Sequence, residues 1–200
     1  MHFEFLKGIQ VLDLSTHYPG PFCSRLLSDL GAKVTRITHP SKKDPVASFG
    51  DSYQEYLNHG KTAIPLDLKK ESDYKEFVAL LREADVLLQG FRPKTMKSLN
   101  IEPEMVFKAN PKVIYCALSG YRLGHPKEND PAHDQNFLAL SGVLSLLDPP
   151  SLPPIPLGDV FAAWHAALLI ASALYARDLG GKNSIFLNPF SGFLYSSFLK

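Results

Sequence analysis

Short apolar strands alternate with helical stretches along most of this chain, and this alternation limits the fold more than any other feature. The expected strands are IQVLDLS, KVTRITHP, TAIPLDL, ADVLLQGF and KVIYCALSG, which begin at residues 9, 33, 62, 84 and 112. Strands that alternate with helices are typical of a parallel sheet covered on both faces. The sequence therefore predicts an α/β fold: a Rossmann-like, doubly wound, mostly parallel sheet with flanking helices, formed by residues 1–200 as a single domain.

The remaining segments are less regular. Residues 41–61 and 120–132 are polar and rich in turn residues, so loops are expected there. Two helices are expected at about 133–147 and 159–178. The apolar run of the second helix contains His165 and is shorter than a usual membrane span of about 20 residues. We therefore expect a central buried helix, followed by an aromatic C-terminal tail over residues 183–200.

The charges are nearly balanced, with 21 Lys and Arg against 20 Asp and Glu. No general attraction to nucleic acid or to an anionic membrane follows, so local groups must hold any anionic ligand. Cys23 and Cys116 stand in apolar surroundings and are expected to be buried free thiols, as in a reducing compartment. The N-terminus does not resemble a secretory signal, and the Cys and His residues lack metal-ligand spacing. We expect a cytoplasmic protein without a metal.

Ligands of an open parallel sheet bind at the carboxyl ends of its strands. The loops expected there are residues 16–21, 38–39, 90–92 and 120–124. The first turn reads STHYPGP rather than G-x-G-x-x-G, and the chain contains no P-loop lysine motif. NAD and nucleoside triphosphates are therefore disfavoured as ligands.

Two titratable residues stand at expected helix starts. His133, in PAHDQNFLALSG, precedes an apolar run, and an imidazole near a helix N-terminus stays available as a neutral base near pH 7. Taken alone, His133 fits a cap or a surface residue better than a catalyst, because most histidines catalyse nothing. Asp159 follows Gly158 and opens the long helix, where Asp is also a preferred N-cap. Together, an acid and a base at the starts of two apolar helices favour one pocket that holds both.

Several stretches, in order, resemble family III CoA-transferases, a family that also contains racemases. They are LKGIQVLDLSTHYPGPFCSRLLSDLGAKVTRITHP, NHGKTAIPLDLK, ADVLLQGFRP, NPKVIYCALSGY, PAHDQNFLALSGVLS and PLGDVFAAWHAALLIASALYAR, within residues 6 to about 178. The resemblance implies an acyl-coenzyme A thioester as the ligand and no further cofactor. It places the family's aspartate at Asp159. Because a His-Asp pair opens the corresponding helix in racemase members, His133 is the candidate base, and Asp134 supports the helix start or orients its neighbours.

Three functions remain open. The first is an epimerase that inverts the α-carbon of a 2-methylacyl-CoA, with His133 removing a proton from one face and Asp159 returning one to the other. Backbone N–H groups near the helix that starts at Asp159 would stabilise the enolate-like intermediate. The second is a CoA-transferase in which Asp159 is the nucleophile that takes up the acyl group. The third is a non-catalytic, degenerate paralogue that binds acyl-CoA or a partner chain.

Coenzyme A carries a 3′-phosphate and a pyrophosphate, so its site must supply cations and N–H donors. The candidates are Arg36, His39, Gly60, Lys61, Gly90, Phe91, Arg92 and Lys97. Two arginines usual in the family are replaced, one by His39 and one by Ser98, and neither His nor a neighbouring Lys offers the bidentate fork of Arg. Family members usually continue into a smaller second domain, so a shortened form without that domain is expected. We also expect a homodimer that buries the aromatic tail.

Overall fold

A parallel sheet forms the centre of the protein in the computed structural model, which describes residues 3–121, 123–147, 149, 151–180 and 185–187. Within these residues the strand order is β3-β2-β1-β4-β5-β6, and every neighbouring pair is parallel. The strands are β1 (Gln10–Asp13), β2 (Lys33–Thr38), β3 (Thr62–Pro65), β4 (Val86–Gln89), β5 (Ile114–Ala117) and β6 (Ile185–Leu187). The order reverses between β1 and β4, so the predicted doubly wound α/β fold is confirmed.

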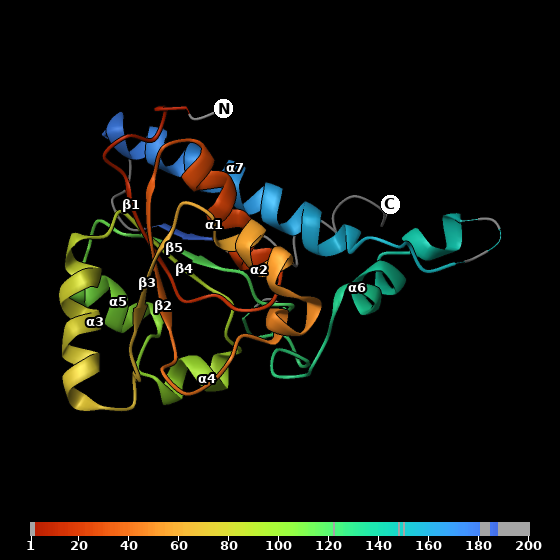
Figure 1. Cartoon of the computed structure of the whole chain (residues 1–200), viewed down its shortest axis with the longest axis horizontal. Coiled ribbons are helices and arrows are strands. Elements are labelled where there is room, and N and C mark those ends of the chain that lie inside the picture. The colour runs from red at the N-terminus through yellow and green to blue at the C-terminus, as the bar shows by residue number, and fades with distance from the viewer. Residues whose placement is uncertain (1–2, 122, 148, 150, 181–184, 188–200) are drawn as a thin grey trace.

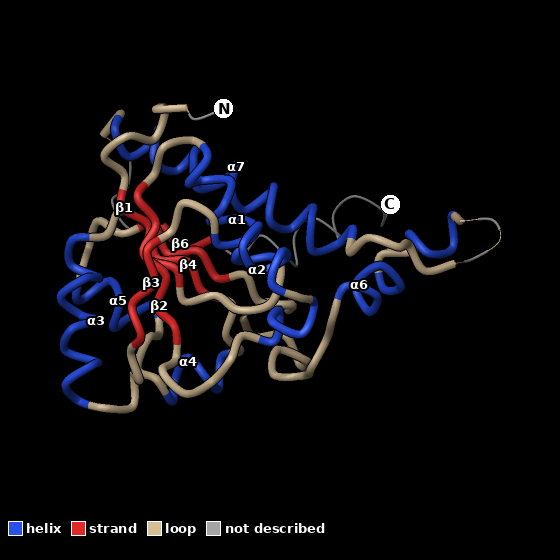
Figure 2. The backbone as a smooth tube through the Cα atoms, viewed as in Figure 1, coloured by secondary structure: helices blue, strands red, loops and turns tan. Residues whose placement is uncertain are grey.

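Helices cover both faces of the sheet (Figures 1 and 2). One face carries α1 (Pro19–Asp29), α2 (Asp51–Asn58) and α7 (Leu157–Asp178), and the other carries α3 (Glu71–Glu83) and α5 (Pro103–Ala109). The short helix α4 (Pro93–Ser98) follows β4. The helix α6 (Asp134–Leu140) and the 3₁₀ helix η2 (Val143–Leu146) project from the molecule near the start of α7.

The central strands are buried on both faces. In β1, Val11 packs into the apolar cluster under α1 and α7, while Leu12 packs into the cluster under α3 and α5. Val86 and Leu87 of β4 divide in the same way. Successive side chains of a strand point to opposite faces, so a strand covered on both sides must be apolar throughout. This explains the unbroken apolar runs of the sequence. Cys23 and Cys116 are buried free thiols in the first cluster, as predicted.

The long helix differs from its prediction. Only one face of α7 is buried, where Ala163, Ala166 and Ile170 pack against α1 and β5. The opposite face exposes large apolar side chains, including Trp164 and Leu168. Among the described helices, α7 alone has the length and apolar composition that a membrane crossing requires, a test that core helices also pass. The helix expected to be central and buried is therefore buried on one face only.

Three further segments differ from the sequence prediction. Residues 41–61, expected to be a loop, contain the 3₁₀ helix η1 (Pro45–Phe49) and α2. The helix expected at 133–147 is broken at Gly142, whose φ of 78° lies in the left-handed region that ends a helix. Strand β6 falls within the expected tail. The rest of that tail lies outside the described residues, so its burial in a dimer stays a prediction.

Candidate active site

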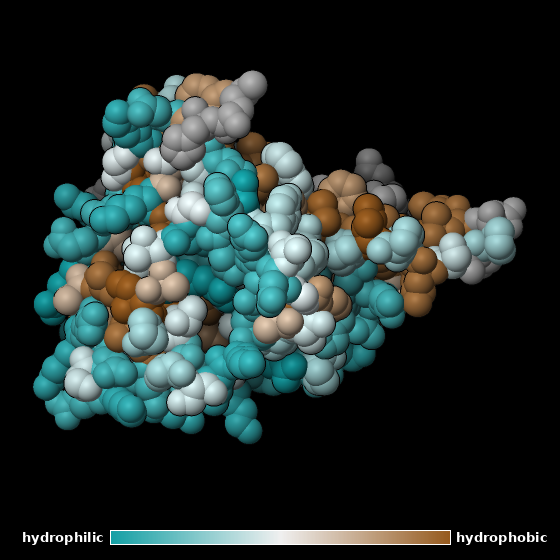
Figure 3. Space-filling view, in the orientation of Figure 1, coloured by the Kyte–Doolittle hydropathy of each residue, from teal (hydrophilic) through white to brown (hydrophobic). Residues whose placement is uncertain are grey.

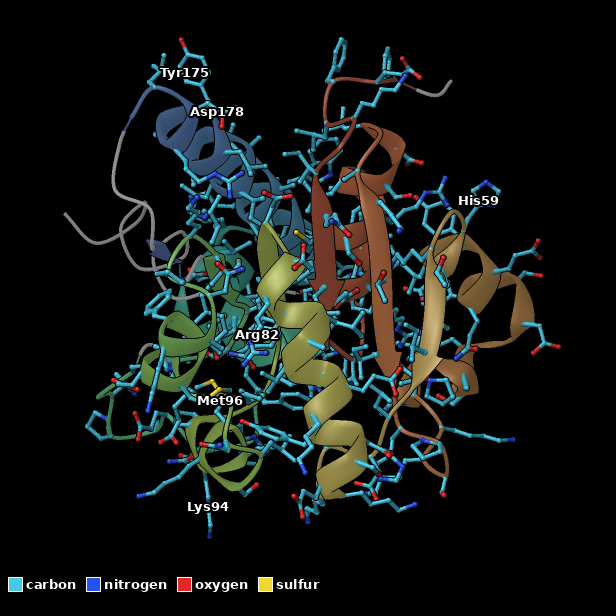
Figure 4. All side chains as sticks on the ribbon, turned by 90° about the vertical axis from the view of Figure 1, so that its left-hand side faces the viewer. His59, Arg82, Lys94, Met96, Tyr175 and Asp178 are labelled. Carbon is cyan, nitrogen blue, oxygen red and sulfur yellow. The ribbon has the colours of Figure 1, made fainter. Side chains whose placement is uncertain are left out.

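A cavity of about 140 Å³ lies at the carboxyl edge of the sheet. The loops after β1, β4 and β5 form it together with the N-terminal ends of α6 and α7. Figure 4 shows Lys94 of α4 at one end of the molecule, and Tyr175 and Asp178 of α7 at the opposite end. The lining residues are Thr16, His17, Pro19, Gly20, Gly90, Arg92, Leu118, Ser119, Gly120, Tyr121, Glu128, Asp130, Ala132, His133, Phe137 and Asp159. Three of the four expected ligand loops contribute, and residues 38–39 do not.

His133 is the N-cap of α6. Its backbone N–H donates to Oδ1 of Asn136 at 2.9 Å, which fixes the first turn of the helix. Its imidazole lies edge-on to the ring of His17, with 5.9 Å between ring centroids. His17 has a φ of 65°, a left-handed conformation that His adopts more readily than most residues. Two imidazoles therefore meet at the cavity, one from the loop after β1 and one from the start of α6.

Asp159 lies in the first turn of α7 but is not its N-cap, because the helix begins at Leu157 and Pro156 is the N-cap. The backbone N–H of Asp159 donates to Oδ1 of Asp134 at 3.0 Å. A Cβ on Gly158 would stand 2.9 Å from the same oxygen, so glycine allows this approach. Asp134 thus ties the start of α6 to the start of α7, in agreement with the orienting role expected for it. The Asp159 amide is consequently not free to stabilise an enolate.

Burial governs the acidity of Asp159. It raises the pKa of this carboxyl to about 7, and the neighbouring Asp134 carboxylate adds to the effect. Near neutral pH the carboxyl is therefore present in both protonated and ionised forms. Burial also raises the pKa of Tyr18 to about 12, with Tyr53, Tyr56 and Asp159 as smaller causes. A carboxyl that titrates near 7 suits a group that must both give and take a proton.

An aromatic wall closes the cavity beside α6. The ring of Phe137 contacts that of Tyr121 at a centroid distance of 5.6 Å, and His125 stacks on Tyr121 at 5.0 Å. A Cβ on Gly120 would come within 2.5 Å of the Phe137 ring, so this close packing requires glycine. Sequence reasoning missed His17, Tyr121 and Phe137. His17 and Tyr121 lie in loops, where the sequence does not reveal which way a side chain faces, and Phe137 lies in α6 as one of several apolar residues.

The predicted coenzyme A residues divide into two groups. Gly90 and Arg92 line the cavity together with His133 and Asp159. The other six lie outside it. Phe91 packs against the apolar cluster under α3 and α5, and Gly60 borders a groove between α1 and α7. Lys97 is exposed on α4. His39 Nε2 stands 3.7 Å from Asp67 Oδ1.

Lys61 and Arg36 point inward, contrary to the prediction that they bind coenzyme A. The Lys61 side chain is 1% exposed, and its ammonium donates to the Pro21 carbonyl and the Ser24 hydroxyl, both at 2.7 Å. Arg36 forms a buried ion pair with Asp44 and donates to Asn58 Oδ1 at 2.9 Å. Internal acceptors hold both cations, so neither is available to a phosphate group. Among the described residues, no group of three or more Cys, His, Asp and Glu could hold a metal ion.

The sheet is doubly wound, and the His133 imidazole and the Asp159 side chain lie where its strands end. This arrangement defines an α/β ligand-binding domain. The model of CoA-transferase family III matches residues 6–188, and the chain belongs to that family. The acetyl-CoA:oxalate CoA-transferase of Acetobacter aceti is 36% identical over 199 residues, which cover 94% of this chain and 51% of that protein. The alpha-methylacyl-CoA racemase of Homo sapiens is 38% identical over 202 residues, covering 97% of this chain and 50% of that protein.

Solved structures agree on the fold. A CaiB/BaiF family protein from Brucella suis matches with a TM-score of 0.89 at 24% identity and covers 98% of this chain and 56% of that chain. The hypothetical protein Rv3272 from Mycobacterium tuberculosis matches with a TM-score of 0.81 at 28% identity, covering 92% of this chain and 55% of that one. The chain spans about half the length of the relatives it matches.

Proposed function

We propose that this protein acts on an acyl-coenzyme A thioester and inverts the α-carbon of a 2-methylacyl group. One observation carries the proposal: His133 and Asp159, each at the N-terminal end of its own helix, line one cavity. The thioester carbonyl acidifies the neighbouring C–H, so proton transfer needs only a base on one face and an acid on the other. Coenzyme A enters as part of the substrate, and the scheme requires no other cofactor.

The reaction moves one proton off the α-carbon and another onto it. His133 takes the α proton as a neutral imidazole, and the electron pair of the C–H bond moves into an enolate. The protonated carboxyl of Asp159 then donates a proton to the opposite face and is left as a carboxylate. Its pKa of about 7 supports both roles near neutral pH. In the reverse direction Asp159 is the base and His133 the acid.

A CoA-transferase is the second candidate, favoured by the 36% identity to the acetyl-CoA:oxalate CoA-transferase. In that reaction the ionised Asp159 attacks the thioester carbonyl, and coenzyme A leaves as its thiolate while an aspartyl anhydride forms. His133 has no required part in this step. Retention of function without His133 therefore separates the two enzymes. A protein that only binds acyl-CoA would catalyse neither reaction.

Deuterium exchange tests the proposal. A single epimer of a 2-methylacyl-CoA, incubated with the protein in D₂O, should gain deuterium at the α-carbon and lose optical purity. His133→Gln and Asp159→Asn keep the side-chain size and should each reduce inversion by at least about 100-fold. His59→Gln is the matched control, because His59 is exposed at the end of α2 and does not line the cavity.

Other outcomes would contradict the proposal. Unchanged inversion in both variants would remove His133 and Asp159 from the mechanism. Acyl transfer to a carboxylate acceptor without inversion, lost in Asp159→Asn but kept in His133→Gln, would establish the transferase. Binding of acyl-CoA with neither reaction would leave the non-catalytic paralogue.

A further inference from the structure

A polar cluster lies in the apolar core beneath the cavity. Asp13, at the end of β1, is fully buried, and its carboxylate accepts a hydrogen bond from the Ser15 amide at 2.8 Å. It also accepts from the hydroxyls of Ser15 and Ser24. The Lys61 ammonium donates to the Ser24 hydroxyl and to the Pro21 carbonyl, and stands 3.9 Å from the Asp13 carboxylate. Ser24 thus joins the buried cation to the buried anion.

This cluster holds both ends of the loop 15–21, which comprises residues 15–18 after β1 and the first three residues of α1. Asp13 binds the loop at Ser15, and Lys61 binds it at Pro21. Between these two points, Thr16, His17, Pro19 and Gly20 line the cavity. The loop is therefore one wall of the site, anchored from inside the core.

The anchored side chains lie directly behind the cavity lining. A Cβ on Gly20 would stand only 2.1 Å from the Ser15 Cβ, so the two residues are in tight contact. A Cβ on Gly90, another lining residue, would stand 3.9 Å from the same atom. A displacement of Ser15 must therefore move the wall, since close-packed interiors transmit such shifts.

The chemistry of Lys61 fits positioning better than packing. Burying an ammonium and a carboxylate costs several kcal/mol, which only well-placed partners offset, so apolar side chains of similar length at both Lys61 and Asp13 would fill the space at lower cost. An apolar side chain cannot bind the Pro21 carbonyl. We propose that Lys61 is a positioning residue that, through Ser24 and Asp13, holds the loop 15–21 in the shape that the reaction at His133 and Asp159 requires. The catalytic part of this proposal rests on the proposed function.

Substitution of the cluster tests the proposal by two separate measurements. Lys61→Met keeps the length of the side chain and removes its donors, and the double variant Asp13→Asn, Lys61→Met removes both buried charges together. In each, kcat for inversion should fall by about 10- to 100-fold, the effect of a small misplacement, while KM for acyl-CoA stays within about twofold. The amide hydrogens of Thr16, His17, Tyr18 and Gly20 should exchange faster, with those of β4 unchanged. Lys33→Met is the control, because Lys33 is exposed on β2.

The two measurements distinguish failure of this proposal from failure of the proposed function. If the native protein catalyses no inversion, the proposed function fails, and the exchange of the loop amides still decides the role of Lys61. A large rise in KM with unchanged kcat would make Lys61 a coenzyme A ligand and overturn the proposal, as would unchanged loop exchange in folded variants. If the Lys61 variants do not fold, Ser24→Ala provides the deciding measurement, because it breaks the link between Lys61 and Asp13 with a smaller change. Faster loop exchange in that variant supports the proposal, and unchanged exchange overturns it.

Discussion

At the scale of single residues, Asp159 gives the clearest dependence on pH. Its pKa is raised from 3.8 to about 7 in the folded protein, so between these values the native state binds more protons than the unfolded state. The contribution of Asp159 to stability is therefore fully present below pH 3.8 and is lost as pH rises through 7. At higher pH a partly buried carboxylate lies near Asp134 and costs stability.

Asp159→Asn should remove the loss of stability that the partly buried carboxylate causes at high pH. We expect the variant to be more stable than the native protein at pH 8 by about 1 to 3 kcal/mol, with a smaller difference at pH 5. Urea unfolding at the two pH values measures this. Asp178→Asn, at an exposed position near the other end of α7, should leave the pH dependence unchanged. A native protein that is more stable than Asp159→Asn at pH 8 would show that the carboxylate is well stabilised where it lies.

At this scale the sequence predicts where helices begin better than it predicts which group pairs with each charged side chain. His133 and Asp159 could be placed because capping residues and apolar runs are local signals. Lys61 could not, because its acceptor Pro21 is 40 positions away in the sequence. The same limit applies to Arg36, whose partner Asp44 lies on a different element. A basic residue in a sequence shows a charge but not the group that neutralises it.

At the scale of elements, the segment with η1 and α2 depends on one ion pair. Asp44 caps η1 by accepting from the Val46 amide at 3.0 Å, and it also accepts from the His17 amide at 3.3 Å. The guanidinium of Arg36 neutralises it, and both side chains are about nine-tenths buried. Arg36 also reaches Asn58 at the end of α2. Removing the cation leaves a buried carboxylate without its partner.

Arg36→Met should therefore destabilise the protein by about 3 kcal/mol or more. The double variant Arg36→Met, Asp44→Asn removes both charges and should recover part of this loss. Guanidinium unfolding gives the free energies, and amide exchange should localise the effect to residues 44–58. A double variant less stable than Arg36→Met would show that the ion pair is not the main contribution to stability.

The same segment explains which elements the sequence could not reveal. The central strands were predictable because burial on both faces makes each one an apolar run. In α2 only Leu57 is buried, so the helix lacks a long apolar stripe and depends on contacts with Arg36 and Arg25. The break at Gly142 is hidden for the opposite reason, since the apolar pattern continues across it into η2.

At the scale of the whole molecule, exposed apolar side chains gather on α7 and on the projection that precedes it. Figure 3 shows them on the projection that precedes α7 and along part of the helix itself. The exposed residues from this region are Leu140, Leu146, Leu152, Ile155, Phe161, Trp164, Leu168, Tyr175 and Leu179. A groove of about 710 Å³ between α1 and α7 adjoins Trp164 and Leu168. Apolar patches of this extent on soluble proteins mark interaction surfaces.

We expect this surface to be covered by a second copy of the chain. Each copy presents both the exposed apolar side chains of α7 and the groove beside them. In a twofold interface, the α7 side chains of one copy can therefore pack into the groove of the other. Leu168 is 64% exposed, so Leu168→Glu should barely affect the folded monomer yet place a charge in the interface. Sedimentation at micromolar concentration should show a dimer for the native protein and a monomer for this variant. Lys108→Glu, on the opposite face in α5, is the control and should remain dimeric. A native protein that sediments as a monomer would contradict the prediction, and a dimer unaffected by Leu168→Glu would place the interface elsewhere.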